Sequence, residues 1–300
     1  MSILLRAVRR FSDGRNELVA SINNLIKPEV VMNIVYSRDG TAIAYDKIGS
    51  GFPLILVDGA LCSRTNGPNG PLAILLQQYF AVITYDRRGR GDSGDTKPYE
   101  IERGVEDLSA LIEEAGGSAF VYGISSGAAL ALEAAKRLPS IRKLALYEAP
   151  FVVDNTRAPV PVAYLEQMEG HLSNERRGAA VKQFMRKGVG LPAFVVAMMP
   201  LMPAWKKLKS VAHTLPYDTI LTVEHQRGTA STLSRWSSVT VPVLVGVGGK
   251  SPAWMRNAMQ SLARSLPSAR LQTLEGQTHI IKPSAITPVL KRFFEEATIV

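Results

Sequence analysis

The sequence is poor in several residue types, and each shortage excludes a class of protein. It contains a single cysteine, Cys62, so it cannot form a disulfide within the chain or a cysteine-built metal site. One cysteine fits a reducing compartment, and we expect a cytoplasmic location. No stretch reaches the ~20 consecutive apolar residues that cross a bilayer, and no internal repeat or low-complexity tract is visible.

The charge is unbalanced but not concentrated. Lys and Arg number 35 against 26 Asp and Glu, a formal net charge of +9. No dense Lys/Arg block is interleaved with aromatic residues, and no zinc-finger signature occurs, so we expect no nucleic-acid partner. Hydrophobic residues make up 46% and charged residues 20%, which is typical of a globular protein with a large core.

Residues 1–30 are predicted to form an N-terminal helical extension. Arg6 interrupts the first apolar run, which is too short for a secretory signal and lacks a small-residue cleavage site. The segment from Ile3 to Ile26 has the spacing of an amphipathic helix. Such a helix packs on the domain or lies on a membrane surface, and we favour packing.

The rest of the chain alternates short apolar runs with helical patterns. Helical spacing covers residues 101–114, 126–137, 253–266 and 284–296. The strands that we expect are 31–36, 41–48, 53–57, 81–85, 119–123, 141–147, 242–247 and 270–274. Near-continuous apolar strands between helices predict an α/β fold with a mostly parallel eight-stranded sheet and helices on both faces.

The alternation stops between residues 158 and 238, where the sequence is helical and rich in Met and Pro. We interpret this segment as a helical lid inserted between two parts of one core, residues 31–157 and 239–300. Its large apolar residues either line an apolar acyl pocket or pack lid helices together; they are Phe194, Met198, Met199, Leu201, Met202, Trp205 and Tyr217. Its basic residues are either solvated or attract an anionic substrate; they are Arg186, Lys187, Lys206, Lys207 and Lys209.

The strongest local signal is the pentapeptide from Gly123 to Gly127, which reads G-I-S-S-G. G-x-S-x-G is a weak pattern alone, but here it follows an apolar strand and leads into a helix of small residues. Such a turn exposes a hydroxyl at a helix N-terminus, where backbone amides favour negative charge. We predict that Ser125 is a nucleophile; the spacing favours it over Ser126.

A serine hydroxyl needs a base to act near neutral pH. Of the four histidines, only His279 follows the last predicted strand, where open α/β sheets build their sites. His171, His213 and His225 lie in or near the predicted lid. We predict that His279 is the base.

From about Val31 onward the chain resembles the α/β-hydrolase superfamily, in particular small bacterial esterase-like hydrolases with a helical cap. The resemblance lies in four segments, 58–60 (DGA), 85–94 (YDRRGRGDSG), 123–127 and 278–279. It implies an oxyanion hole formed by the backbone amides of Ala60 and Ser126, and arginines that brace the loops around the turn. Where the family often has histidine this chain has Asp58, a carboxylate that we expect near the site.

The resemblance also implies a catalytic acid in the loop after residue 247, but the matching position is Ser251. No carboxylate occurs from Ser237 to Arg270, and without an acid the histidine tautomer is not controlled. Similarity to some haloalkane dehalogenases implies Glu148 as the substitute. The alternatives are that Glu148 only anchors a loop, or that Asp154 is the acid.

These residues predict a carboxylesterase-like serine hydrolase that cleaves a small ester, thioester or lactone through an acyl-enzyme on Ser125. We expect a small-molecule substrate with an apolar acyl group and no cofactor or metal. The alternative is a hydrolase-fold ligand receptor with little or no turnover, which the serine at position 251 keeps open. Contact of the N-terminal helix and the basic lid with an anionic membrane is a third and less favoured hypothesis.

Overall fold

The computed structural model describes residues 33–296. The predicted N-terminal extension, residues 1–30, therefore lies outside the described residues.

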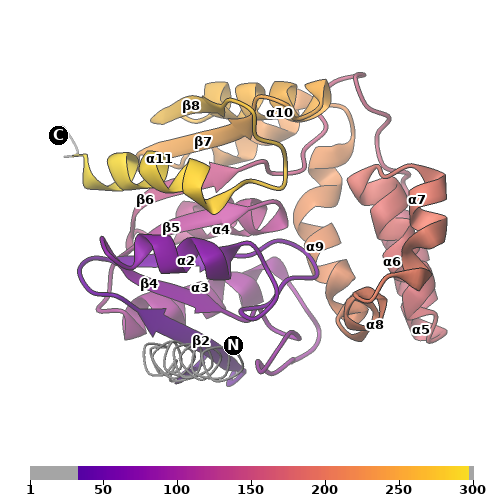
Figure 1. Ribbon diagram of the computed structural model, residues 1–300, viewed down its shortest axis with the longest axis horizontal. Coiled ribbons are helices and arrows are strands. Elements are labelled where there is room, and N and C mark those ends of the chain that lie inside the picture. Colours follow the sequence, from indigo (N-terminus) through magenta and orange to yellow (C-terminus); the bar gives the residue numbers. More distant parts are fainter. Residues whose placement is uncertain (1–32, 297–300) are drawn as a thin grey trace, which may run out of the picture. The chain divides into compact units, whose positions relative to one another are not determined.

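A single sheet of eight strands runs through the described chain, in the order β1-β2-β4-β3-β5-β6-β7-β8 (Figure 1). Strand β2 is antiparallel to both of its neighbours, and every other neighbouring pair is parallel. The strands are β1 (Asn33–Tyr36), β2 (Ala42–Ile48), β3 (Pro53–Val57), β4 (Ala81–Tyr85), β5 (Ala119–Ile124), β6 (Ile141–Tyr147), β7 (Val243–Gly248) and β8 (Ala269–Leu274). The predicted α/β-hydrolase sheet is confirmed.

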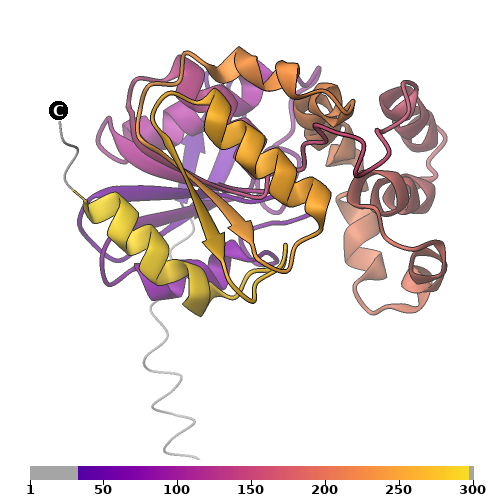
Figure 2. The same cartoon turned by 90° about the horizontal axis from the view of Figure 1, so that it is seen from above.

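Helices cover both faces of this sheet, which is why its central strands are apolar along their whole length. On one face lie α2 (Asn69–Leu76) and α11 (Pro283–Glu295), packed against apolar residues of the strands. On the other face lie α3 (Ile101–Glu114), α4 (Ser126–Arg137) and α10 (Ala253–Ser265). The two layers are visible on either side of the strands in Figures 1 and 2.

Between β6 and β7 the chain leaves the sheet. Residues 148–242 are all described, and they form helices and loops without a strand. We call Tyr164–Trp236 the helical insertion; it projects from one side of the sheet and its covering helices (Figure 2). Its helices are α5 (Tyr164–Ser173), α6 (Arg177–Gln183), η1 (Phe184–Val189), α7 (Ala193–Met198), η2 (Met199–Leu201), α8 (Trp205–Ser210), η3 (Ala212–Thr214), α9 (Leu215–Thr222), η4 (Val223–Gln226) and η5 (Ala230–Trp236).

The parallel strands β3, β5, β6, β7 and β8 all end at the same edge of the sheet. The segments that follow them therefore come together in space, although they are far apart in the sequence. Among residues 33–296, no helix has the length and apolar content that crossing a membrane requires.

Candidate active site

Ser125 occupies the sharp turn between β5 and α4, at the centre of the sheet. Its backbone has φ 58° and ψ −130°, a conformation that side-chain-bearing residues rarely adopt. The flanking glycines allow this turn. A Cβ at Gly123 would lie 2.6 Å from the carbonyl oxygen of Gly127, and a Cβ at Gly127 would collide with the Val57 carbonyl oxygen. The turn therefore presents the serine at the carboxyl edge of the sheet, where the sequence predicted it.

Glu148 and His279 meet at the same edge. Glu148 follows β6 with φ 48° and is fully buried, and His279 follows β8. The Nδ1 atom of His279 lies 2.9 Å from Glu148 Oε2. With the proton on Nδ1 donated to the carboxylate, the Nε2 lone pair is free to accept a proton.

Ser251, at the position where the resemblance implies an acid, supports the glutamate instead. Its hydroxyl donates to Glu148 Oε1 at 2.5 Å, and the Gly248 amide donates to the same oxygen at 2.8 Å. Glu148 thus accepts hydrogen bonds on one oxygen and holds the imidazole with the other. Asp154 lies elsewhere; it accepts hydrogen bonds from Thr156 and Asn257.

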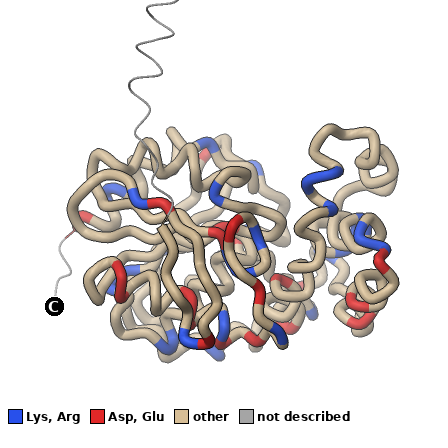
Figure 3. The backbone as a smooth tube through the Cα atoms, turned by 90° about the horizontal axis from the view of Figure 1, so that it is seen from below, with Lys and Arg blue, Asp and Glu red and all other residues tan. Residues whose placement is uncertain are grey.

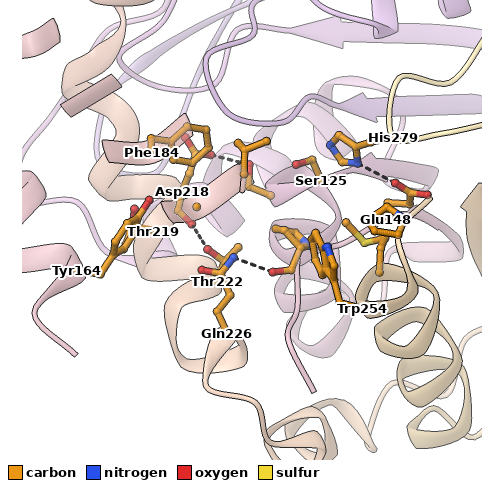
Figure 4. Close-up of a pocket in the computed structure, with 16 residues that line it drawn as sticks. Ser125, Glu148, Tyr164, Phe184, Asp218, Thr219, Thr222, Gln226, Trp254 and His279 are labelled. Carbon is orange, nitrogen blue, oxygen red and sulfur yellow. Dashed lines mark hydrogen bonds and ion pairs between the residues drawn. The ribbon is translucent and has the colours of Figure 1, made fainter. Parts of the chain in front are cut away.

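Ser125 and His279 line one cavity, and Figure 4 shows the imidazole between the serine and Glu148. Among the described residues no hydrogen bond joins the Ser125 hydroxyl to the ring. Such contacts are often long in a ligand-free site and shorten when substrate binds. The structure therefore brings the three sequence-predicted residues to one place.

The loop after β3 passes directly over Ser125. A Cβ at Gly59 would lie 2.9 Å from the Ser125 Cβ. The Gly59 carbonyl oxygen accepts a hydrogen bond from Arg90 Nη1 at 2.7 Å. Because a trans peptide is planar, the Ala60 N–H points away from that carbonyl and hence from the arginine. Arg90 thus sets the orientation of the Ala60 amide.

A carboxylate of the helical insertion holds this arginine. Asp218 of α9 is 1% exposed and accepts from Arg90 Nη2 at 2.6 Å and from Arg87 Nη1 at 2.7 Å. The Ser126 hydroxyl donates to the same carboxylate at 2.7 Å. Burial alone raises the pKa of Asp218, but the charges of Arg90 and Arg87 outweigh it and lower the pKa below its usual value. The insertion is thereby tied to the loops on both sides of Ser125.

Sequence reasoning did not find Asp218. The resemblance implied that the arginines after β4 brace the loops. Arg88 pairs with Asp39 and Asp107 of the core, but Arg87 and Arg90 share a partner more than a hundred residues further along the chain. A lone Asp in a short helix carries no local sign of a buried ion pair.

Asp58, the carboxylate that the sequence places near the site, does not line the cavity. It is 3% exposed and its carboxylate lies against Gly67. Burial raises its pKa to about 7, although Arg90 and Arg87 act in the opposite direction.

The cavity has a volume of about 210 Å³ and lies between the core and the insertion. From the core it is lined by Ser125, Ser126, Glu148, Pro150, Pro252, Trp254, Met255 and His279. From the insertion it is lined by Tyr164, Phe184, Gly188, Val189, Asp218, Thr219, Thr222 and Gln226.

The cavity wall is mainly apolar because most of its polar groups are bonded elsewhere. The hydroxyls of Thr219 and Thr222 donate to carbonyls one turn back in α9, and the Gln226 amide donates to the Pro150 carbonyl. The polar groups that stay available include Ser125 and His279 of the predicted site, and the Tyr164 hydroxyl, which forms no hydrogen bond within the described residues. Such a cavity suits an apolar group carrying one reactive polar centre.

The apolar residues that the sequence suggested for an acyl pocket do not line this cavity. Phe194, Met198, Leu201 and Met202 are exposed, and Met199 is buried among other residues of the insertion. Sequence patterns cannot separate these roles, because the apolar residues of short helices have no clear periodicity.

The remaining candidate residues serve packing. His225 is buried against Phe151 and Trp236, and burial lowers its pKa to about 4. Burial raises the pKa of the Cys62 thiol to about 12, so it stays protonated. Within residues 33–296, no group of three or more His, Cys, Asp or Glu residues is placed to hold a metal ion.

Comparison with known proteins shows the family of the chain. The Alpha/beta hydrolase family matches residues 59–285. An alpha/beta hydrolase from Sphaerobacter thermophilus DSM 20745 is 49% identical, with a TM-score of 0.79 over 87% of this chain and 100% of the other. The chain belongs to the alpha/beta hydrolase family.

More distant solved structures share the fold. A thermophilic esterase from Thermogutta terrifontis is 19% identical, with a TM-score of 0.61 over 88% of this chain and 97% of the other. An esterase from Rhodococcus sp. ECU1013 is 20% identical, with a TM-score of 0.60 over 87% and 98%. At this identity the two structures show the shared fold, and it is the family match that supports a hydrolase acting on a small molecule.

Proposed function

We propose that this hydrolase cleaves a small ester, thioester or lactone through an acyl-enzyme on Ser125. The observation that carries the proposal is the His279 imidazole, bonded through Nδ1 to buried Glu148 and lying beside Ser125 on one apolar cavity. Nucleophilic acyl transfer requires an exposed serine, a base that takes its proton and an acid that orients the base.

The reaction follows from these positions. His279 Nε2 takes the Ser125 hydroxyl proton while Oγ attacks the acyl carbon, and the carbonyl electrons move onto its oxygen. The intermediate collapses, the bond to the leaving group breaks, and the imidazolium returns the proton to that group. Water then attacks the acyl-enzyme by the same route, releasing the acid and restoring the serine. Glu148 stabilises the imidazolium in both halves.

The amides of Ala60 and Ser126 stabilise the oxyanion. The Ala60 amide is turned away from Arg90 because Arg90 holds the Gly59 carbonyl, and the Ser126 amide stands at the N-terminus of α4. Both donors are set before substrate arrives, so little reorganisation is needed during the reaction.

Cavity size supports a short acyl group. An engineered apolar cavity of about 150 Å³ in another protein holds a benzene molecule. The volume here, about 210 Å³, therefore accommodates a ring or a short branched chain. We expect kcat/KM to fall for p-nitrophenyl esters once the acyl chain exceeds this space.

Covalent labelling tests the proposal. A fluorophosphonate probe should add its mass to the folded protein at Ser125, and a panel of p-nitrophenyl esters of different acyl length should be hydrolysed. Ser125→Ala should abolish labelling and lower kcat by at least about 10⁴-fold. Ser109→Ala, a serine on α3 away from the cavity, should change neither.

Two outcomes would contradict it. Absence of both labelling and turnover in folded protein would favour a ligand receptor that does not turn over its ligand. Peptide mapping that places the adduct on Ser126 would identify a different nucleophile.

A further inference from the structure

One side of the helical insertion exposes an apolar surface that no described residue covers. Phe194 and Met198 on α7, with Leu201 and Met202 just beyond it, are 49–76% exposed. The segment 197–204, which includes the last three of these residues, reads AMMPLMPA, and all of it except Met199 is exposed. Soluble proteins rarely expose contiguous apolar surface of this kind unless something binds there.

The charged residues around this apolar surface are mainly cations, although Glu175 lines the same hollow as Pro200 and Trp205. No Asp or Glu occurs between Glu175 and Asp218, and within residues 33–296 no cation of that interval forms an ion pair. Figure 3 shows an uncharged stretch of the insertion bordered by blue positions. The cations in the interval are Arg176, Arg177, Lys182, Arg186, Lys187, Lys206, Lys207 and Lys209.

We call residues 194–204 together with the cations of this interval the apolar-basic face. Its positive charge excludes two possible binding partners. A second copy paired through the same face would bring cations opposite cations, because a two-fold interface is self-complementary. The chain's own residues 1–32 carry five Lys and Arg against three Asp and Glu, a net charge of +2, and so are also repelled. The face needs a partner that is both apolar and anionic.

We propose that the apolar-basic face docks on an anionic lipid surface. Apolar side chains enter the boundary between headgroups and acyl chains, while Lys and Arg beside them bind phosphate and carboxylate headgroups. Exposed apolar residues in the centre and lysines at the edge match the two layers of a bilayer surface. A nucleic acid offers phosphates but no matching apolar layer.

Docking would also bring the cavity to the membrane. Val189 lines the cavity and is 41% exposed, and it lies on the chain just before α7. Four residues separate Val189 from Phe194 along the chain, so a docked enzyme could take its acyl substrate from the bilayer. This consequence rests on the proposed function, whereas docking itself does not.

Vesicle binding by the full chain tests the proposal. Wild-type protein should co-sediment with phosphatidylcholine vesicles that contain phosphatidylserine, and much less with pure phosphatidylcholine. Binding should weaken at high salt because surface charges are screened.

Two pairs of variants locate the binding surface. Lys206→Glu with Lys207→Glu should lower the partition coefficient by about ten-fold or more. Lys47→Glu with Lys97→Glu gives the same change in net charge on exposed core positions and should lower it far less.

The apolar half is tested in the same way. Leu201→Ser with Met202→Ser should lower partition by about ten-fold or more, whereas Ile74→Ser, at a 61% exposed position on α2, should not. None of these residues lines the cavity, so hydrolysis of a water-soluble ester should stay unchanged in every variant.

Three results would overturn docking by this face: no binding of wild-type protein to anionic vesicles, equal losses in the test and control variants, or a dimer in solution that Leu201→Ser dissociates. Vesicle binding without any ester hydrolysis would refute the proposed function and leave docking intact.

Discussion

The core and the helical insertion contribute to the same cavity in different ways. The core supplies Ser125, Glu148 and His279 from segments that follow three strands of one sheet edge. The insertion supplies half of the cavity wall and the buried carboxylate of Asp218, which holds Arg87 and Arg90. The proposed catalytic groups are thus placed by the sheet, whereas the insertion lines half of the space around them and braces the loop that carries Gly59 and Ala60.

Two buried carboxylates sharpen this contrast. Asp58 of the core and Asp218 of the insertion both lie near Arg87 and Arg90, yet the pKa of Asp58 is raised and that of Asp218 is lowered. Asp218 accepts hydrogen bonds from both guanidinium groups, whereas neither arginine donates to the Asp58 carboxylate. The charges of Arg90 and Arg87, with the hydrogen bonds that Asp218 accepts, outweigh burial at Asp218, whereas burial outweighs the same charges at Asp58.

The largest loss of activity is expected from a substitution in the core. Glu148→Gln should lower kcat by about 10³–10⁴-fold, because an amide does not hold the imidazole in the required tautomer. KM should change little, and the measurement is steady-state kinetics on a p-nitrophenyl ester. Asp154→Asn is the matched control, since it removes a carboxylate that forms no contact with His279.

If Glu148 only anchors its loop, Glu148→Gln and wild type will differ in melting temperature while kcat stays within about ten-fold, a far smaller loss than removing a triad member causes. That result would return the identity of the acid to an open question.

A substitution in the insertion is expected to have a smaller effect on kcat and a second effect on stability. Asp218→Asn should lower the free energy of unfolding by about 3 kcal/mol, because two buried arginines lose their counter-charge. It should also lower kcat by about 10²-fold, since Arg90 would no longer hold the Gly59 carbonyl in one orientation. Denaturant unfolding and kinetics measure the two parts separately.

Ser126→Ala is the control for Asp218, because it removes one hydrogen bond to the carboxylate and keeps the backbone amide. It should cost less than about ten-fold in kcat. An Asp218→Asn variant that is less stable but retains wild-type kcat would show that the insertion has no part in positioning the site.

The smallest effect, and one that depends on pH, is expected at Asp58. Burial raises the folded-state pKa of Asp58 from its ordinary value of 3.8 to about 7, so between these values the folded state binds a proton that the unfolded state releases. The contribution of protonated Asp58 to the free energy of unfolding is therefore fully present below pH 3.8 and is lost as the pH rises toward 7. The loss is at most about 4 kcal/mol for this shift.

Asp58→Asn should therefore stabilise the protein above pH 7 and change its stability little near pH 4, as measured by urea unfolding at several pH values. A constant difference between the variant and wild type across this range would mean that Asp58 does not titrate there.

The core could be predicted from sequence because its signals are local. Fully buried parallel strands are continuous apolar runs, so the strand limits agree with the structure to within one or two residues wherever they are described. Helix α2 was missed, since it begins after Pro68 and reads NGPLAILL, without the polar face that marks an amphipathic helix.

The insertion could be predicted only as helical. Its short helices do not show which apolar residues face the cavity, so Phe184 and Tyr164 were not identified, while exposed Phe194 and Met198 were considered for that role. Side-chain direction in a helix of one or two turns depends on what it packs against.

The sequence by itself determined the sheet, the turn that carries Ser125 and the position of His279 after the last strand, because each depends on neighbours within a few residues. Tertiary structure alone decided that Glu148 contacts the imidazole, that Ser251 supports that glutamate and that Asp218 holds Arg90. These pairs are separated by up to 131 residues. A hydrogen bond across such a distance depends on how the whole chain folds, and no local pattern records it.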